Sequence, residues 1–513
     1  MSVTVEATPQ ALAEPKLPKA DPCTIIIFGA SGDLTKRKLL PALYTLNLAS
    51  SLDESFHVLG IGQDQMTDQQ FRDSMREGVT DDQEGTVLSP DKWGNFEQRL
   101  FYIQGELTDQ ETYRTIAERL GGLAKQKGAT GNHLFYFSTP PSLAPSIVQG
   151  LGAAGLAGEE SGWSRIIVEK PFGRDLESAC QLNREIAKIF QEKQVYRIDH
   201  YLGKETVQNL MVFRFGNSLF EPVWNRNYID FVEITAAETL GVGTRAEYYE
   251  EAGALRDMVG NHMLQLLTLT AMEPPVAFDA DAVRGQKVQV LRSIHPMTEQ
   301  QVAEWTVRGQ YGPGRIGDES VPGYREEKGV AKDSATETYV AVKFDICNWR
   351  WADVPFYLRA GKRLGKPDTE IAVHFKRTPQ ALFSQTADDQ MEPNIIALRI
   401  QPEEGITLRF GAKRPGPEMH TGTVHMDFSY QSGFGIKSPE AYVTLLLDVM
   451  RGDATLFIRG DMAEDQWKLI TPIEEAWAKQ QPPEFPNYAA GSDGPEQANE
   501  MLARSGHAWR PLQ

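Results

Sequence analysis

The sequence predicts an α/β, doubly wound N-terminal domain and a C-terminal β+α domain with a large, mainly antiparallel sheet. Strand and helix patterns alternate over the first two hundred residues, which is typical of a parallel sheet with helices on both faces. Strand-like segments dominate the remainder, and few helical patterns separate them after residue 335. We therefore expect a tail over residues 1–21, one domain over 22–200 and a second over 201–513.

The N-terminal domain begins with a strand that is covered on both faces. Thr24–Phe28 is a continuous apolar run, and leucines at positions 39, 40, 43 and 46 then recur at helical spacing. A second strand over His57–Ile61 precedes the start of a helix at Phe71–Met75. Later strands are expected at Leu134–Phe137 and Arg165–Val168.

The C-terminal domain is predicted mainly from short apolar or alternating segments that favour strands. These segments are Phe231–Ala237, Tyr339–Phe344, Phe356–Arg359, Ile371–Phe375, Ile395–Ile400, Ile406–Phe410 and Val424–Phe428. Two stretches have helical spacing, Ala254–Met272 and Ser438–Met450. Residues 480–494 are rich in Pro, Gly and Asn, and we expect a surface loop there.

The charge of the chain limits its partners. It has 513 residues and a formal net charge of −18, which argues against non-specific binding to nucleic acid or to anionic membranes. An anionic ligand would need a local basic pocket. No apolar run reaches membrane-spanning length, and residues 1–21 have the composition of a disordered tail rather than of a signal peptide.

The three cysteines, Cys23, Cys180 and Cys347, are far apart and form no CxxC motif. Neither a disulfide framework nor a zinc site is expected, and we find no other metal-ligand cluster. A reducing, cytoplasmic location is the natural prediction. A regulatory role for Cys180 is left open, although isolated cysteines are more often packing residues.

A glycine-containing turn joins the first strand to the first helix. It reads Gly29, Ala30, Ser31, Gly32, Asp33, and Leu34 follows. A dinucleotide pyrophosphate needs close backbone approach and free N–H groups at a helix N-terminus, so the position favours a Rossmann-type dinucleotide-binding domain. The turn departs from GxGxxG at Ser31 and Leu34, and many ordinary turns also carry two glycines.

Charged residues near this turn bear on the cofactor. Lys36, Arg37 and Lys38 lie in the first helical turns, where cations oppose the helix dipole unless an anion lies nearby; ordinary surface charge is the alternative. The end of the second strand distinguishes NAD from NADP through an acid or an arginine. This chain has Gln63 and Asp64 there, which leaves the preference open.

Three further segments carry candidate chemistry. The run Arg197–Glu205 combines an acid, an imidazole, a phenol and cations, which can hold an anion and orient a proton acceptor; a solvated helix start is the alternative. Lys170 follows a strand at the edge where open α/β sheets bind ligands. Lys362 and Lys366 flank a basic turn that is suggestive of anion contact.

His262 lies on the apolar face of its predicted helix. A lone histidine in that position is more often a core residue. However, Asp257 lies about one turn away, and a general base needs a partner that fixes its tautomer. A carboxylate from another segment could supply that partner, and Asp199 is the candidate.

Together these motifs resemble the glucose-6-phosphate dehydrogenase family, from Thr24 to about Arg504. The residues that carry the resemblance are Gly29–Leu34, Glu169–Gly173, Arg197–Glu205, Gly253–Met258 with Asn261–His262, and Arg359–Lys362. The run Arg197–Glu205 is highly specific to that family, whereas the GxxGD turn alone is not.

The resemblance implies oxidation of glucose 6-phosphate to 6-phosphogluconolactone, with hydride transfer to NADP and no metal. His262 would accept the proton of the C1 hydroxyl, and Asp199 would orient His262. The implied substrate-binding residues are Lys170, His200, Tyr201, Lys204, Glu238, Asp257, Lys362 and Lys366, with His200, Tyr201 and Lys204 on the phosphate. The implied cofactor-binding residues are Gly29, Ser31, Gly32, Asp33, Leu34, Lys38, Gln63 and Lys170. The family holds Lys170–Pro171 in cis and forms homodimers through its large sheet, sometimes extended to tetramers.

Two positions depart from the family pattern. Gln63 stands where many members have an arginine that binds the 2′-phosphate, so NADP is the first choice on family grounds and NAD or dual use stays open. Gly260 replaces a usual glutamine, for which we have no functional interpretation. An oxidoreductase acting on an unphosphorylated sugar and a non-catalytic nucleotide sensor are the competing hypotheses. The cluster of His200, Tyr201 and Lys204 argues against the first, because a neutral sugar would leave its charge unmatched. The presence of both Asp199 and His262 argues against the second.

Overall fold

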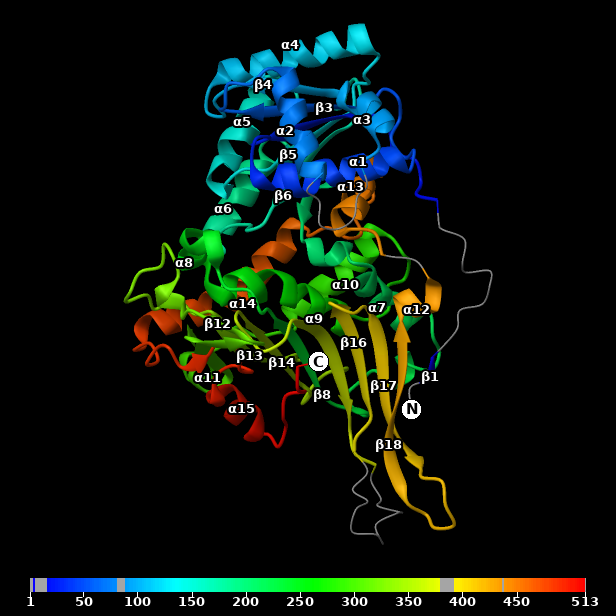
Figure 1. Ribbon diagram of the computed structural model, residues 1–513, viewed down its shortest axis with the longest axis vertical. Coiled ribbons are helices and arrows are strands. Elements are labelled where there is room, and N and C mark those ends of the chain that lie inside the picture. The colour runs from blue at the N-terminus through cyan, green and yellow to red at the C-terminus, as the bar shows by residue number, and fades with distance from the viewer. Residues whose placement is uncertain (1–2, 5–15, 81–87, 379–391, 436–437, 513) are drawn as a thin grey trace.

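The computed structural model describes residues 3–4, 16–80, 88–378, 392–435 and 438–512. Two sheets organise these residues, a smaller one formed by the first two hundred residues and a larger one below it in Figure 1. None of the described helices combines the length and the apolar character that a membrane crossing requires.

The N-terminal sheet has six parallel strands in the order β4-β3-β2-β5-β6-β7. This is the doubly wound order in which the first strand of the domain lies at the centre and ligands bind at the carboxyl ends of the strands. The strands are β2 (Thr24–Phe28), β3 (His57–Gly62), β4 (Leu100–Gln104), β5 (His133–Phe137), β6 (Ser164–Glu169) and β7 (Val195–Ile198). The predicted doubly wound domain is confirmed, although β4 and β7 were not among the predicted strands.

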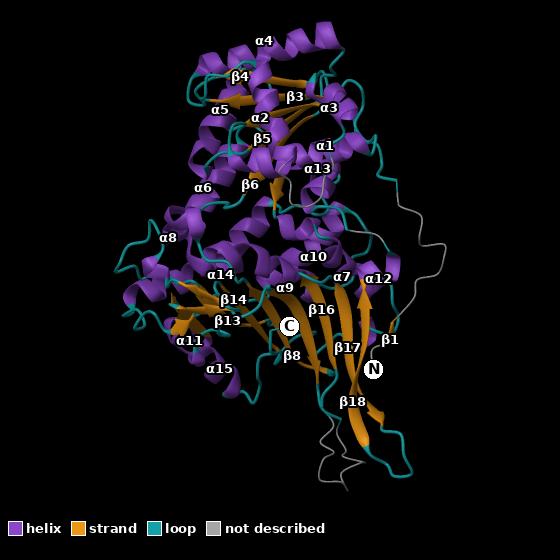
Figure 2. Cartoon of the chain, in the orientation of Figure 1, coloured by secondary structure: helices purple, strands orange, loops and turns teal. Residues whose placement is uncertain are grey.

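Helices surround this sheet, as Figure 2 shows. The segment after β2 begins as a π-helix, Thr35–Leu39, and continues as α1 (Leu40–Leu48). The other helices are α2 (Asp68–Thr80), α3 (Pro90–Glu97), α4 (Gln110–Lys127), α5 (Ala144–Ala153) and α6 (Leu176–Ala187). Their apolar faces cover strands that are buried throughout, such as β2 and β3.

The large sheet has nine described strands in the order β1-β18-β17-β16-β15-β8-β14-β13-β9. They are β1 (Val3–Thr4), β8 (Ile229–Ala237), β9 (Thr306–Gly309), β13 (Tyr339–Asp345), β14 (Pro355–Gly361), β15 (Asp368–Phe375), β16 (Ile395–Gln401), β17 (Gly405–Lys413) and β18 (Thr421–Ser429). Most neighbours are antiparallel, as predicted, but β8 pairs in parallel with β14 and β1 with β18. The parallel pair β8–β14 brings Glu238 and Lys362 to the same end of the sheet.

Most helices of the second half lie between the large sheet and the N-terminal sheet (Figure 2). They are α7 (Glu205–Phe215), α8 (Ala246–Ala254), the π-helix η8 (Leu255–Met263), α9 (Leu264–Ala271), α10 (Ala280–Arg292), α12 (Tyr430–Phe434), α13 (Ala441–Arg451) and α14 (Gly460–Lys479). The helices α11 (Glu299–Trp305) and α15 (Glu496–Ala503) pack against β9, at one edge of the large sheet. The short strands β10 (Tyr311–Gly312), β11 (Gly314–Ile316), β12 (Glu319–Val321) and β19 (Tyr488–Ala489) form two small additional sheets.

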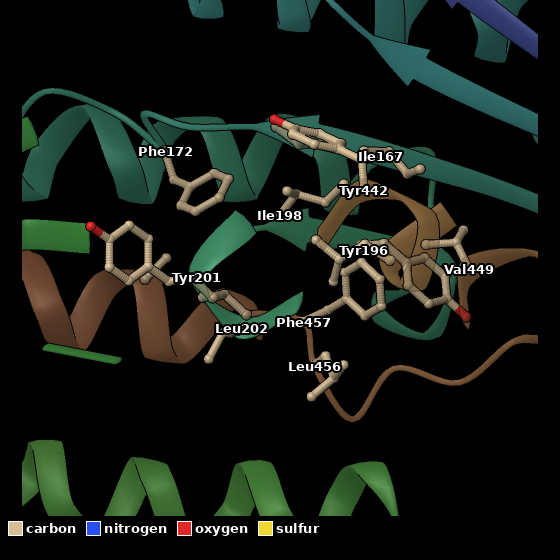
Figure 3. Close-up of a cluster of buried hydrophobic side chains, with 14 of the residues drawn as sticks. Ile167, Phe172, Tyr196, Ile198, Tyr201, Leu202, Tyr442, Val449, Leu456 and Phe457 are labelled. Atoms are coloured by element: carbon tan, nitrogen blue, oxygen red, sulfur yellow. The ribbon is translucent and has the colours of Figure 1, made fainter. Parts of the chain in front are cut away.

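The chain returns to the N-terminal sheet late in the sequence. The helix α13 packs against α1 and against the 3₁₀ helix η5 (His200–Gly203), which follows β7. Figure 3 shows Tyr442 of this helix near Ile167 and Ile198 of the sheet, and Val449 near Tyr196. Because these side chains belong to one continuous buried cluster, the two halves share a core.

Three predicted boundaries differ from the structure. The helix expected at Ser438–Met450 begins at Ala441, because the Glu440 side chain caps it by accepting from the Tyr442 N–H. Residues 480–494 are not simply a surface loop, because Tyr488 is buried and pairs in β19 with β10. Within the expected tail, Val3–Thr4 forms β1 and Ala20 is buried, while residues 1–2 and 5–15 lie outside the described residues.

Candidate active site

A π-helix carries the two central side chains of the site. Gly253 interrupts the preceding helix with φ of 61°, and η8 (Leu255–Met263) then runs as a π-helix. In such a helix residues five positions apart lie on one side, which aligns Asp257 with His262. The N-terminus of η8 is capped by Glu337, whose Oε1 accepts from the Leu255 N–H at 3.0 Å.

His262 meets Asp199 across 63 positions of sequence. Asp199 follows β7 and caps η5, where its Oδ1 accepts from the Tyr201 N–H at 3.0 Å and from Nδ1 of His262 at 2.5 Å. Both side chains are almost fully buried. The contact that the sequence analysis expects is therefore present.

Lys170 fixes the tautomer of His262. Its Nζ lies 2.8 Å from Nε2 of His262 and 3.0 Å from Oδ1 of Asp257. An ammonium group can only donate, so Nε2 is the accepting nitrogen and Nδ1 carries the hydrogen that points at Asp199. The imidazole thus presents a lone pair at Nε2, as a general base requires.

The two carboxylates of the site stay ionised. Burial by itself raises the pKa of Asp199, but the interaction with His262 outweighs it and holds that pKa well below its usual range. Burial also opposes ionisation of Asp257, and Lys170 is the main group that lowers its pKa despite that burial. The hydroxyl of Tyr248 donates to Oδ1 of Asp257 at 3.0 Å and stabilises the same charge.

Beyond His262 lies a cluster of polar side chains from η5. The Tyr201 ring stacks on the His262 ring with centroids 4.3 Å apart, and the His200 ring lies edge-on at 4.7 Å. Burial is the main reason that the pKa of His200 lies well below its ordinary value. Nζ of Lys204 lies 5.1 Å from the Tyr201 ring centre and donates to Oε1 of Gln401. These groups offer proton donors to an anion placed between them.

A second pair forms at the carboxyl ends of β8 and β14. Nζ of Lys362 donates to Oε2 of Glu238, and Lys362 also lies 5.1 Å from the ring centre of Tyr249. Lys366 is different, because it is exposed and makes no hydrogen bond or ion pair within the described part of the chain. The structure brings Glu238 and Lys362 together but does not join Lys366 to them.

Asp199, His200 and His262 place possible metal-ligand atoms within 4.8 Å of one another. Two ligands on one tetrahedral zinc ion lie about 3.3 Å apart, given metal–ligand distances of about 2.0–2.1 Å. The 2.5 Å between Asp199 and His262 is shorter and corresponds to a hydrogen bond. The contact between Asp199 and His262 is accordingly a hydrogen bond, which can orient a proton acceptor.

The glycine-containing turn has the geometry of a phosphate cradle. Gly29 has φ of 79°, and a Cβ there would overlap the carbonyl oxygen of Ser138. Ser31, Gly32 and Asp33 are exposed and Leu34 is half-buried at the start of the helix. An exposed turn with this backbone at a helix N-terminus fits a dinucleotide pyrophosphate.

The basic residues behind the turn all have acidic partners. The ion pairs are Lys36–Glu77 at 2.9 Å, Arg37–Asp33 at 3.5 Å and Lys38–Glu440 at 3.6 Å. At the end of β3, Gln63 is exposed and its Nε2 donates to Oε2 of Glu106 at 2.8 Å. The predicted cofactor-binding residues therefore line one edge of the sheet.

Comparison with known proteins decides the family. A model described as the glucose-6-phosphate dehydrogenase NAD binding domain matches residues 26–209, and one for the C-terminal domain of the same enzyme matches residues 211–510. The chain belongs to the glucose-6-phosphate dehydrogenase family. The resemblance inferred from the sequence is confirmed.

Other members of the glucose-6-phosphate dehydrogenase family match over nearly their whole length. Glucose-6-phosphate 1-dehydrogenase of Chlamydia pneumoniae is 46% identical over 100% of both chains, and that of Aggregatibacter actinomycetemcomitans is 48% identical over 96% of this chain and 98% of its own. A solved structure of glucose-6-phosphate dehydrogenase in complex with its substrate glucose-6-phosphate is 34% identical, with a TM-score of 0.87 over 96% of this chain and 100% of that one. A second, from Mycobacterium avium, is 36% identical, with a TM-score of 0.82 over 96% and 99%.

Several residues of this family member escaped the sequence analysis. Tyr248 and Gln401 contact predicted site residues, and Glu337 caps the helix that carries Asp257 and His262. All three lie in segments without a recognisable motif. Gly260 lies in η8, where its carbonyl accepts from Nε2 of Gln466 and a Cβ would lie 3.6 Å from Ile470. The glycine thus lies against α14, and an alanine would make only ordinary contacts there.

Proposed function

We propose that the chain oxidises glucose 6-phosphate at C1 to 6-phosphogluconolactone and transfers the hydride to NADP, with NAD or dual use as the alternative. The observation that carries this proposal is the accepting Nε2 of His262, held by Asp199 beside a cluster of proton donors. The names of the curated relatives and the solved complex of a relative with glucose 6-phosphate support the same reaction.

His262 acts as the base in the tautomer that has its hydrogen on Nδ1 and its lone pair on Nε2. Nε2 of His262 accepts the proton of the C1 hydroxyl as the C1 hydrogen leaves as hydride. Asp199 then faces an imidazolium through Nδ1–H, and its charge stabilises that cation. Lys170 donates to the same Nε2 before substrate binds, so the C1 hydroxyl replaces it as the donor.

The phosphate is proposed to lie against η5. The ester is a dianion near neutral pH, and His200, Tyr201 and Lys204 can donate charge-assisted hydrogen bonds to it. A nearby dianion favours the charged imidazole, so phosphate binding would raise the pKa of His200 from its low value. Glu238, Asp257, Lys362 and Lys366 are proposed to receive the sugar hydroxyls.

Gly29, Ser31, Gly32, Asp33 and Leu34 are proposed to hold the pyrophosphate of the dinucleotide. Lys38, Gln63 and Lys170 are proposed as further cofactor contacts. When bound, the nicotinamide ring supplies the hydride acceptor. The chain itself orients the dinucleotide, binds the sugar and moves the proton, and no step requires a metal.

The domain assignments follow from the same reasoning. We propose residues 22–200 as the cofactor domain and 201–513 as the substrate and dimerisation domain, in a cytoplasmic homodimer or homotetramer. The large sheet, whose strands β17 and β18 stay partly exposed, would supply the interface.

The test is turnover followed by the near-ultraviolet absorbance of the reduced nicotinamide. Purified protein is given glucose 6-phosphate with NADP and, separately, with NAD; the expected result is reduction of at least one of them. Unphosphorylated glucose is the matched substrate control. Reduction with glucose alone would favour the other-sugar hypothesis, and binding of a dinucleotide without any turnover would favour the sensor.

A further inference from the structure

An acid at the cofactor edge has no role in the proposed function. β3 is the second strand of the doubly wound order, and Gln63 follows its last residue. In such sheets the side chain at this point lies beside the adenosine ribose. Glu106 comes two residues after the end of the neighbouring β4, and its Oε2 accepts from Nε2 of Gln63 at 2.8 Å.

The backbone holds this amide–carboxylate pair in place. The Gly105 N–H donates to the Gly62 carbonyl at 2.9 Å, which continues the β3–β4 ladder one residue beyond the end of β4. The Glu106 carbonyl accepts from Oγ1 of Thr112 at 2.8 Å. A Cβ on Gly62 would lie 3.2 Å from Oγ of Ser31, so the pair lies next to the phosphate-binding turn.

We propose that Glu106 is a specificity-determining residue that lowers the preference for NADP relative to NAD; this inference rests on the proposed function. With NAD, the carboxylate accepts a hydrogen bond from the ribose 2′-hydroxyl. With NADP, the 2′-phosphate meets a like charge, and Gln63 offers it a donor without a positive charge. The cations behind the turn are already paired with Glu77, Asp33 and Glu440, so they compensate the repulsion only weakly.

The geometry also predicts how an arginine at position 63 behaves. A guanidinium there can form a bidentate pair with the Glu106 carboxylate, which lies within hydrogen-bond distance of the present side chain. Gln63→Arg alone therefore improves NADP use only modestly. When Glu106→Gln is added, the guanidinium is released for the 2′-phosphate, and the combined effect exceeds the product of the two single effects.

The experiment compares wild type, Glu106→Gln, Gln63→Arg, the double variant and Asp64→Asn. Asp64→Asn removes the same charge from an exposed acid next to Gln63 and is the matched control. Two quantities are measured for each protein: the NADP/NAD ratio of kcat/KM at saturating glucose 6-phosphate, and the ratio of the two dinucleotide dissociation constants by calorimetry. The dissociation constants test the role of Glu106 even if the protein shows no turnover. A lack of turnover would count against the proposed function and not against this inference.

Glu106→Gln is expected to shift both ratios about tenfold toward NADP, as removal of one like charge near a phosphate predicts. The KM for glucose 6-phosphate should stay within about twofold, and Asp64→Asn should leave both ratios within about twofold. Unchanged ratios in Glu106→Gln, an equal change for both dinucleotides, or a larger shift in Asp64→Asn would each overturn the proposal. Strictly multiplicative effects in the double variant would overturn the pairing of the introduced guanidinium with Glu106.

Discussion

At the residue scale, the chemistry depends on which nitrogen of His262 carries the hydrogen. Nδ1 faces the Asp199 carboxylate, which can only accept, so Nδ1 carries the hydrogen. Nε2 faces the Lys170 ammonium, which can only donate, so Nε2 carries the lone pair. Stacking on Tyr201 fixes the plane of the ring as well. The base is therefore pre-oriented before substrate arrives, which limits the cost of ordering it in the transition state.

Replacing His262 by Asn should remove turnover while leaving substrate affinity nearly intact. The amide has no basic lone pair, so kcat should fall by about 10²–10⁴-fold, the usual contribution of a positioned base. The dissociation constant for glucose 6-phosphate should change by no more than several-fold. Steady-state kinetics and calorimetry measure the two, and near-wild-type turnover would exclude His262 as the base.

Lys204→Ala should affect the binding of glucose 6-phosphate, whereas His262→Asn should affect turnover. Because Lys204 is proposed to contact the phosphate, its loss should raise KM by about 10- to 100-fold, as expected for a hydrogen bond to a charged group. Steady-state kinetics with varied glucose 6-phosphate measures this change. An unchanged KM would remove Lys204 from the phosphate site.

A buried lysine near the site makes stability depend on pH. Burial lowers the pKa of Lys287 from 10.5 to about 7, and Asp199 is the charge that opposes this shift. Between these two values the unfolded chain binds more protons than the folded one, so stability rises with pH across that window. The burial penalty is thus largest at and below pH 7 and is relieved above it.

Lys287→Met tests this charge with a side chain of similar shape. The variant should gain thermal stability over wild type at pH 6–7, and the difference should shrink as the pH approaches 10. Thermal denaturation across that range measures it. A gain that is constant with pH would mean that the amine binds its proton equally in the folded and unfolded chain, so that burial does not lower its pKa.

At the element scale, the turn after β2 depends on one backbone conformation. Gly29 has positive φ, and any Cβ would overlap the Ser138 carbonyl, so the glycine is needed both for conformation and for space. The same turn places the helix N-terminus that we propose as the pyrophosphate site. Loss of that geometry should therefore affect dinucleotide binding and folding together.

Gly29→Ala should lower the free energy of unfolding by about 1–3 kcal/mol and weaken dinucleotide binding. Gly121→Ala, at an exposed position within α4 where a Cβ meets nothing within 4 Å, is the matched control. It should add about 0.5–1 kcal/mol of stability without changing binding. Chemical denaturation and calorimetry measure these effects; wild-type binding in Gly29→Ala would show that the turn does not contact the cofactor.

The π-helix η8 shows what sequence reasoning misses at this scale. The spacing predicted a helix over Ala254–Met272, and a helix is present, but its first part is π-helical and begins after the break at Gly253. A Cβ at Gly253 would overlap the Glu337 carboxylate that caps this helix. Because the cap comes from a distant segment, local periodicity could not reveal it.

At the scale of the whole molecule, the C-terminal segment is bound to the face of the large sheet. Arg510 donates to Glu370 of β15 through Nε at 2.7 Å and through Nη2 at 3.2 Å. The Arg510 N–H lies 3.1 Å from Oε2 of Glu233 in β8, and the Arg510 carbonyl accepts from Arg359 in β14. One residue thus joins three strands, two of which lead to Glu238 and Lys362.

Arg510→Ala should lower the free energy of unfolding by up to about 3 kcal/mol, since it leaves a buried carboxylate without its partner. Burial already raises the pKa of Glu370 although Arg510 opposes this. A carboxyl with a raised folded pKa is relieved when it is protonated, so the loss should be smaller at pH 5 than at pH 7.5. Denaturant titration at both values tests this, with Arg114→Ala in an exposed pair as a control that should match wild type.

A buried core joins the two halves, so a boundary drawn in the sequence at residue 200 does not separate two independent cores. The strands of the N-terminal sheet were predicted from continuous apolar runs, because full burial leaves that pattern in the sequence. β7 was missed, since it has four residues and includes the buried Arg197, whose guanidinium is satisfied by Glu192 and Asn183. The return of α13 to this sheet depends on the tertiary fold and has no local signal.

By itself, the sequence determined the doubly wound domain, the large antiparallel sheet, the phosphate-binding turn and the family, because these depend on local apolar patterns and on contiguous motifs. The sequence named Asp199 as a candidate partner of His262, but only the tertiary structure brought the two into contact. It alone also decided that Lys170 donates to the other nitrogen of His262 and that Gln63 donates to Glu106. Each of these pairs joins segments from different strands or helices. Their approach is set by how the elements pack, and a hydrogen bond over such a distance in sequence leaves no periodic trace in the chain.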